Sequence, residues 1–113
     1  MINNQHYLDW KQKEIDEAVE HVLLIEKKRG VGEIHTPFIM MDWVNQFARE
    51  DLAIAVIEKR PDLKIFKSTP YMAKHDACGR PMWAVAKNKK TLLDSLPTAS
   101  IPEGLDWQER LIA

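Results

Sequence analysis

The residue pattern of this chain changes at Pro61. Before Pro61, apolar residues recur at three- and four-residue spacing, which is typical of helices that bury one face. After it, short runs of β-compatible residues are separated by proline and glycine, which is typical of strands joined by turns. The pattern therefore predicts an α+β fold, in which helices of the N-terminal half pack on a small antiparallel β-hairpin or sheet.

The first helix is predicted over residues 9–29. The apolar residues that give it one buried face are Ile15, Ala18, Val19, Val22, Leu23 and Ile25. The cations of its last turn suit the negative end of the helix dipole, and Gly30 can take the left-handed conformation that ends a helix. We expect residues 30–32 to form a short flexible joint.

The second helix is predicted to begin at Pro37, which follows Thr36 as an N-cap, and to end before Pro61. Residues 38–60 contain no glycine or proline. The sequence therefore does not decide between one long helix and two helices joined near residues 45–50. Two helices would make a helix-turn-helix, whereas one would make a plain helical hairpin with the first helix.

Strands are predicted beyond Pro61, over residues 63–67, 71–75 and 82–86. The segment 77–80 is expected to be a hairpin turn, because Gly79 takes positive φ without steric cost. One or two helical turns follow over residues 89–96. Residues 1–96 are therefore predicted to form a single α+β domain, since a chain of 113 residues has the length of one domain.

The remaining residues, 97–113, are predicted to form a C-terminal tail. It is expected to start extended and to end in a short helix, for which Ser100 and Glu103 are spaced as a capping box. Trp107 and Leu111 on that helix are the candidate partner-binding residues, because an aromatic ring on an acidic tail suits a protein contact. Simple docking of the tryptophan onto the body is the alternative.

Charge is distributed unevenly along the chain. The net charge is -1, yet residues 57–90 carry nine Lys or Arg against three Asp or Glu. Because basic surfaces attract phosphate groups, this segment is the candidate nucleic-acid-binding surface. The predicted nucleic-acid-binding residues, which include one arginine of the preceding helix, are Arg49, Lys59, Arg60, Lys64, Lys67, Lys74 and Arg80. The alternative is a solvated basic sheet face that binds nothing.

Motifs for catalysis are not found in the sequence. It has no glycine-rich phosphate loop, no histidine pair at metal-binding spacing and no serine elbow. A thiol and an imidazole lie close together at Cys78 and His75, where they could act as nucleophile and base. A polar hairpin tip is the favoured interpretation, because the fold normally brings catalytic Cys and His together. We predict no enzymatic activity, no catalytic residue, no metal site and no cofactor.

The sequence shows no sign of membrane or secretory targeting. It starts without the basic and apolar regions of a signal peptide, and no run of about 18 apolar residues occurs. Cys78 is the only cysteine, so an internal disulfide is excluded. We therefore expect a cytoplasmic protein that does not bind membranes. The sequence does not determine the oligomeric state, and a homodimer is one of the possibilities.

The order helix, helix, helix, strand, turn, strand over residues 9–88 resembles a winged helix-turn-helix DNA-binding domain. The stretch 74–85, in which a Gly-Arg turn precedes an apolar strand, is similar to the wing hairpin of small phage regulatory proteins. The resemblance implies that residues 49–60 form a recognition helix for the DNA major groove and that residues 74–80 touch phosphates.

Two functions follow from these observations. The first is a small nucleic-acid-binding regulatory protein that uses the basic helix and hairpin, with DNA as its partner. The alternative is an accessory protein of the phage or plasmid type that binds and inhibits or modulates another protein, through the acidic first helix or the tail. Neither is catalytic. A third hypothesis, a small enzyme, depends on Cys78 and His75 alone.

Overall fold

The computed structural model describes residues 4–34, 45–73, 76–98 and 104–111, and within them the side chains of residues 12–34, 50–70, 81–97 and 104–111. In chain order the elements are α1 (Asn4–Arg29), β1 (Val31–Ile34), α2 (Asn45–Lys59), β2 (Lys64–Ala73), β3 (Asp76–Ala86), α3 (Lys89–Ser95), the 3-10 turn η2 (Leu96–Thr98) and β4 (Trp107–Glu109). The predicted α+β class is confirmed.

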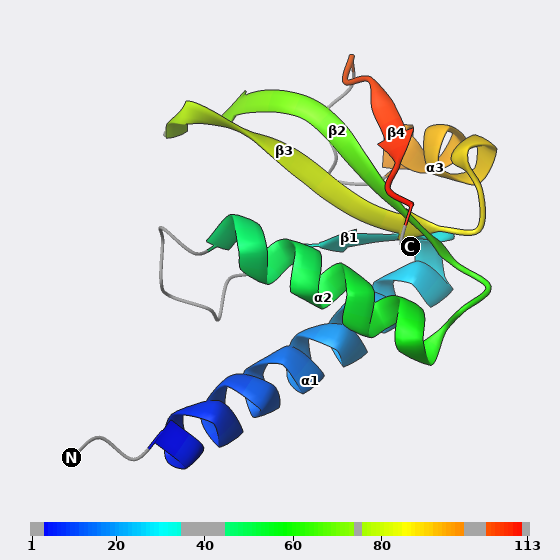
Figure 1. Cartoon of the computed structure of the whole chain (residues 1–113). Helices are drawn as coiled ribbons and strands as arrows, with labels where there is room; N and C mark the ends of the chain where they lie inside the picture. The colour runs from blue at the N-terminus through cyan, green and yellow to red at the C-terminus, as the bar shows by residue number, and fades with distance from the viewer. Residues whose placement is uncertain (1–3, 35–44, 74–75, 99–103, 112–113) are drawn as a thin grey trace.

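The strands form one antiparallel sheet with the order β1-β3-β2-β4. The long hairpin β2–β3 makes its centre, and the two short strands lie at its edges. Figure 1 shows the sheet between two layers, with α1 and α2 on one side and α3 on the other. Because helices cover both faces, residues 65–66 of β2 and 83–86 of β3 are buried whichever face they point to, as are all four residues of β1.

The first helix extends farther toward the N-terminus than predicted, and its end is as predicted: Gly30 takes a left-handed φ of 79°. The predicted flexible joint is wrong, because residues 31–34 form β1 and pair with β3. Gly32 lets this strand approach α1 closely. A Cβ atom there would lie 2.8 Å from Val22 Cγ1 and 2.9 Å from Val85 Cγ2, so any larger residue would force α1 away from the sheet.

The second helix, α2, ends at Lys59, two residues before Pro61, as the proline predicts. The predicted helix start at Pro37 lies outside the described residues. Both alternatives for residues 37–60, one long helix or two helices, therefore stay open.

The predicted hairpin turn at residues 77–80 is wrong. These residues belong to β3, in which Arg80 pairs with Tyr71 and Asp76 pairs with Ala73, so the chain reverses between Ala73 and Asp76. Gly79 permits a turn but does not require one, since its φ is not positive. Likewise, the proline at position 70 does not break β2, because a register shift between Lys67 and Pro70 accommodates its missing N–H.

The C-terminal segment differs most from its prediction. Residues 89–95 form α3 as expected, but the predicted terminal helix is wrong, because Trp107–Glu109 form β4 and pair with β2. The apolar spacing of so short a segment does not distinguish helix from strand. The capping-box residues Ser100 and Glu103 lie outside the described residues.

Two apolar cores result, one on each face of the sheet. The first holds α1 and α2 against the sheet, and its largest fully buried side chains are Leu52, Val19, Val22, Val56, Trp83 and Val85. The second lies under α3 and β4 and is made of Val31, Phe66, Ala84, Ala86, Leu92 and Trp107. The C-terminal segment is therefore part of the packed body as far as the structure describes it.

Candidate nucleic-acid interface

The predicted basic residues that the structure describes are spread over more than one part of the sheet. Strand β2 has 10 residues and spans roughly 30 Å from Lys64 to Ala73. Lys59, Arg60 and Lys64 are at the end of the sheet where β2 begins, which we call the base. Arg80 lies nearer the opposite end and its side chain is not described. Lys74 lies outside the described residues, as does the side chain of Arg49 in α2.

Three segments that are distant in sequence meet at the base. Ala86 of β3 pairs with Val31 on one side and with Lys64 on the other, which brings the end of α1 and the start of β2 beside the β3–α3 turn. The Ser95 hydroxyl of α3 donates a hydrogen bond to the carbonyl oxygen of Arg29 at 3.0 Å, which fastens α3 to the end of α1.

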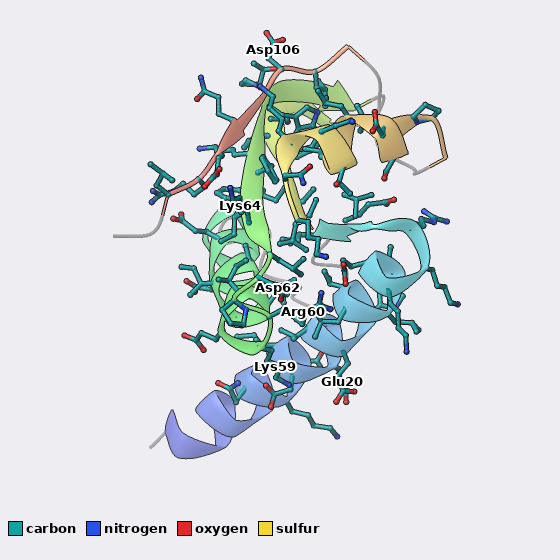
Figure 2. The ribbon with its side chains drawn as sticks, turned by 90° about the vertical axis from the view of Figure 1, so that its right-hand side faces the viewer. Glu20, Lys59, Arg60, Asp62, Lys64 and Asp106 are labelled. Carbon is teal, nitrogen blue, oxygen red and sulfur yellow. The ribbon has the colours of Figure 1, made fainter. Side chains whose placement is uncertain are left out.

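Lysines of these segments lie at the same end of the molecule, which we call the basic end. Its members are Lys27, Lys28, Lys59, Lys64, Lys87, Lys89 and Lys90, all of them exposed. Figure 2 looks onto this end of the molecule and shows Lys59 and Lys64 on either side of the turn between α2 and β2. The basic end therefore combines residues from the first layer, the sheet and the second layer.

Most of these ammonium groups are not neutralised. Five of them form no ion pair with any other described residue: Lys27, Lys28, Lys59, Lys89 and Lys90. Lys64 Nζ lies 3.7 Å from Glu109 Oε1, but both side chains are at least one-third exposed, so this pair is weak. Lys87 is close enough to Asp62 to help lower the pKa of that carboxyl.

Both arginines at the base, in contrast, are held by carboxylates. Arg60 makes two parallel hydrogen bonds of 2.9 Å to Asp62 and a third of 3.0 Å to Glu26 Oε2. Arg29 Nη1 lies 3.0 Å from Glu33 Oε1, whose side chain is buried. The hydrogen bonds with Arg60 lower the pKa of Asp62, and those with Asp62 together with the Glu26 charge raise the pKa of Arg60.

Lys67 lies apart from the basic end. Its ammonium group is 5.3 Å from the ring centre of Trp83, a cation–π contact. It also lines an open pocket of about 300 Å³ together with Ser68, Thr69, Asp106 and Gln108. The contact with Trp83 places Lys67 over the first core, and its role in nucleic-acid binding stays a prediction.

The predicted partner-binding residues have opposite surroundings. Trp107 is 2% exposed and packs in the second core, so its ring is not offered to a partner, and the alternative of docking onto the body describes it. Leu111 is 71% exposed. It lines a groove of about 200 Å³ whose apolar part also includes Ile57, Leu63 and Ile65.

Part of the basic end is not predictable from local sequence. Lys27 and Lys28 suit the helix dipole of α1, and Lys87, Lys89 and Lys90 belong to the generally basic segment 57–90, so neither set points to the other. Their meeting depends on the pairing of β1 with β3. A prediction of residues 31–34 as a strand would have indicated that the end of α1 lies beside the end of β3.

The structure gives little on catalysis or metal binding. His75 lies outside the described residues, and the side chains of Asp76, Cys78 and Arg80 are not described. Among the residues that are described, no three His, Cys, Asp or Glu side chains cluster as they would around a metal ion. None of the described helices is both long and apolar enough to span a bilayer.

Comparisons with known proteins do not assign a family. No family model matches the chain, and no significant similarity was found to a curated protein or to a solved structure.

Proposed function

We propose that this protein binds DNA through the basic end, as a small accessory or regulatory protein without catalytic activity. The observation that carries the proposal is the presence of seven exposed lysines at one end of the sheet, on the three segments that meet at the base. Phosphate contacts from Lys and Arg supply most of the affinity of non-specific DNA binding and a large share of specific binding.

The local charge balance supports this proposal. The segments 26–29, 58–64 and 87–90, which form the base, contain nine Lys or Arg and three Asp or Glu. Their positive potential extends about 8 to 10 Å at moderate ionic strength, which is enough to overlap between neighbouring segments. The net charge of -1 for the whole chain therefore conceals one strongly positive end.

The winged-helix resemblance suggests a different contact, through α2. The described side chains of α2 that are exposed are Asp51, Glu58 and Lys59, so that part of the helix carries more negative than positive charge. A recognition helix in the major groove lies close to phosphates on both sides. We therefore place the DNA at the basic end, and the winged-helix arrangement stays a prediction about topology.

Fluorescence anisotropy of a labelled mixed-sequence DNA duplex tests the proposal. We expect binding at low salt whose logarithmic dependence on salt has a slope of about -0.9 for each phosphate contact. The variant Lys89→Gln/Lys90→Gln should bind about tenfold more weakly, because each exposed ion pair contributes up to about 1 kcal/mol. Its salt slope should fall in magnitude by about 2.

The matched control is Lys13→Glu, which changes the net charge by the same two units on an exposed part of α1 away from the base. It should bind nearly as well as the unmodified protein. No binding at low salt, or equal weakening by the control, would exclude the basic end as a DNA surface. Thermal melting of both variants checks that the fold is intact.

A protein partner is the second candidate, and the groove beside Leu111 favours it. The apolar part of this groove, with the exposed Leu111 at its edge, can accommodate one apolar side chain of a partner. The exposed Asp16, Glu17 and Glu20 of α1 are the alternative contact for a basic partner. Leu111→Ser should abolish capture of such a partner from a cell lysate without changing the melting temperature, whereas unchanged capture would remove this groove from consideration.

A further inference from the structure

The groups at the basic end that could read base edges are already engaged within the protein. Direct readout in the major groove relies mainly on Arg bidentate to guanine and on Asn or Gln bidentate to adenine. Arg60 is bound by Asp62 and Glu26, and Arg29 is bound by Glu33. The carboxamide oxygen of Asn88 accepts a hydrogen bond from the Thr91 amide at 2.8 Å, which caps α3.

The exposed cations at this end that form no ion pair with another described residue are lysines. An ammonium group is a compact point charge on a flexible stem, without the planar fork that fits a guanine edge or a carboxylate. Contacts of this kind to phosphate position a protein on DNA but carry no sequence information. The cations of the basic end thus differ by type: both guanidinium groups form hydrogen bonds with carboxylates, whereas five of the seven ammonium groups form no ion pair with another described residue.

We infer that the basic end binds the sugar-phosphate backbone of duplex DNA without reading its sequence. This inference rests on the proposed function and narrows its substrate class to mixed-sequence duplex. The exposed lysines on the end of α1, on the α2–β2 turn and on the β3–α3 turn provide phosphate contacts from three directions. Arg60 and Arg29 are each engaged by a carboxylate, whereas five of the lysines have no such contact with a described residue.

Anisotropy titrations of the full chain with two short duplexes test this inference, one rich in A·T pairs and one rich in G·C pairs. We expect affinities that agree within about fivefold and parallel salt dependences, because all contacts are to phosphate. Unlabelled mixed-sequence DNA should displace either probe as well as the probe's own unlabelled duplex does. An affinity ratio above about fivefold, the least that one good bidentate base contact provides, overturns the inference and leaves the proposed function standing.

The variant Arg60→Lys gives a second readout, the ratio of the affinities for the two duplexes. Loss of folding would weaken binding to both duplexes and would not change this ratio. The ratio of the two affinities should stay unchanged, because the guanidinium is engaged by carboxylates and does not contact bases. A ratio that shifts with this substitution would show that Arg60 reads sequence, and would also overturn the inference. Absence of binding to both duplexes would instead remove the proposed function and the inference with it.

Discussion

The two faces of the sheet are covered in different ways. On the first face, α1 and α2 together contribute 41 helical residues, and their buried side chains interlock with Ile65, Trp83 and Val85. On the second face, the cover is a helix of seven residues, a 3-10 turn and the three-residue strand β4. Few residues therefore hold the second layer, and Leu92 and Trp107 are its main anchors.

The difference matters because the basic end lies where the two layers meet. Lys27 and Lys28 belong to the first layer, whereas Lys89 and Lys90 belong to the second. The Ser95 hydroxyl oxygen of α3 joins the layers, since it lies within hydrogen-bond distance, 3.0 Å, of the carbonyl oxygen of Arg29 at the end of α1. If the second layer detached, its lysines would leave the surface while the first core stayed packed.

Trp107→Ala tests this comparison with the largest expected effect. Removal of a buried tryptophan from a core costs about 3 to 5 kcal/mol of unfolding free energy, and we expect the lower end because β4 is a three-residue edge strand. Urea denaturation gives the loss. Hydrogen exchange should accelerate first at residues 66–68, which pair with β4, and least in α1.

Leu111→Ala is the control for this change, because the side chain is 71% exposed and its removal should alter stability by no more than about 0.5 kcal/mol. A loss below about 1 kcal/mol for the tryptophan variant would contradict the burial of Trp107. Equal acceleration of exchange in both layers would contradict their separate packing.

Gly32→Ala probes the first face with a smaller effect. The added methyl group would lie within 3 Å of side chains from both α1 and β3, so overpacking should cost about 1 to 3 kcal/mol. Gly104→Ala is the matched substitution on the side of β4, where no atom lies within 4 Å of the new Cβ. It should cost about 1 kcal/mol, through the left-handed φ of 83° alone.

Thermal or urea unfolding of the two glycine variants measures how much unfolding free energy each substitution removes. The close approach of α1 to β1 predicts the larger loss for Gly32→Ala. If the two losses are equal, or if the order is reversed, the first layer is not packed as tightly against the sheet as the structure indicates.

The smallest expected effect is the pH dependence at the base. Hydrogen bonds from Arg60 lower the folded-state pKa of Asp62, so the carboxylate stabilises the fold fully above the ordinary aspartate pKa of about 3.9. This contribution is lost as the pH falls through the lower folded-state value. Asp62→Asn should therefore lose less stability than the unmodified protein between pH 7 and pH 3, measured by urea denaturation.

Asp94→Asn is the control, since Asp94 is exposed and forms no ion pair with another described residue. It should keep the pH dependence of the unmodified protein. An identical acid sensitivity of Asp62→Asn would mean that the Arg60–Asp62 contact does not persist in solution.

The first layer could be predicted from the sequence to a greater extent than the second. A helical apolar repeat runs through α1 for several turns, and Pro61 restricts where α2 ends, so both signals are local. Strands β1 and β4 have four and three residues, too few for a repeat, and each is defined by pairing with a distant strand. The hairpin turn was misplaced because Gly79 was taken for a turn residue.

The candidate site was predictable only in part for the same reason. The excess of cations in residues 57–90 was visible in the sequence, and Lys59 and Lys64 belong to the basic end. The addition of Lys27 and Lys28 requires the pairing of β1 with β3, which joins segments more than 50 residues apart. The contact of Arg60 with Glu26 and that of Lys67 with Trp83 are likewise tertiary, so neither is visible in the sequence.

The most direct test of the account is NMR mapping of backbone amide shifts during titration with duplex DNA. The account predicts that the perturbed amides cluster at residues 26–30, 59–64 and 87–91, and that those of β4 do not move. Perturbations concentrated in the first turns of α2 and near Arg80, with the basic end unchanged, would contradict it and would favour the recognition-helix arrangement of a winged-helix protein.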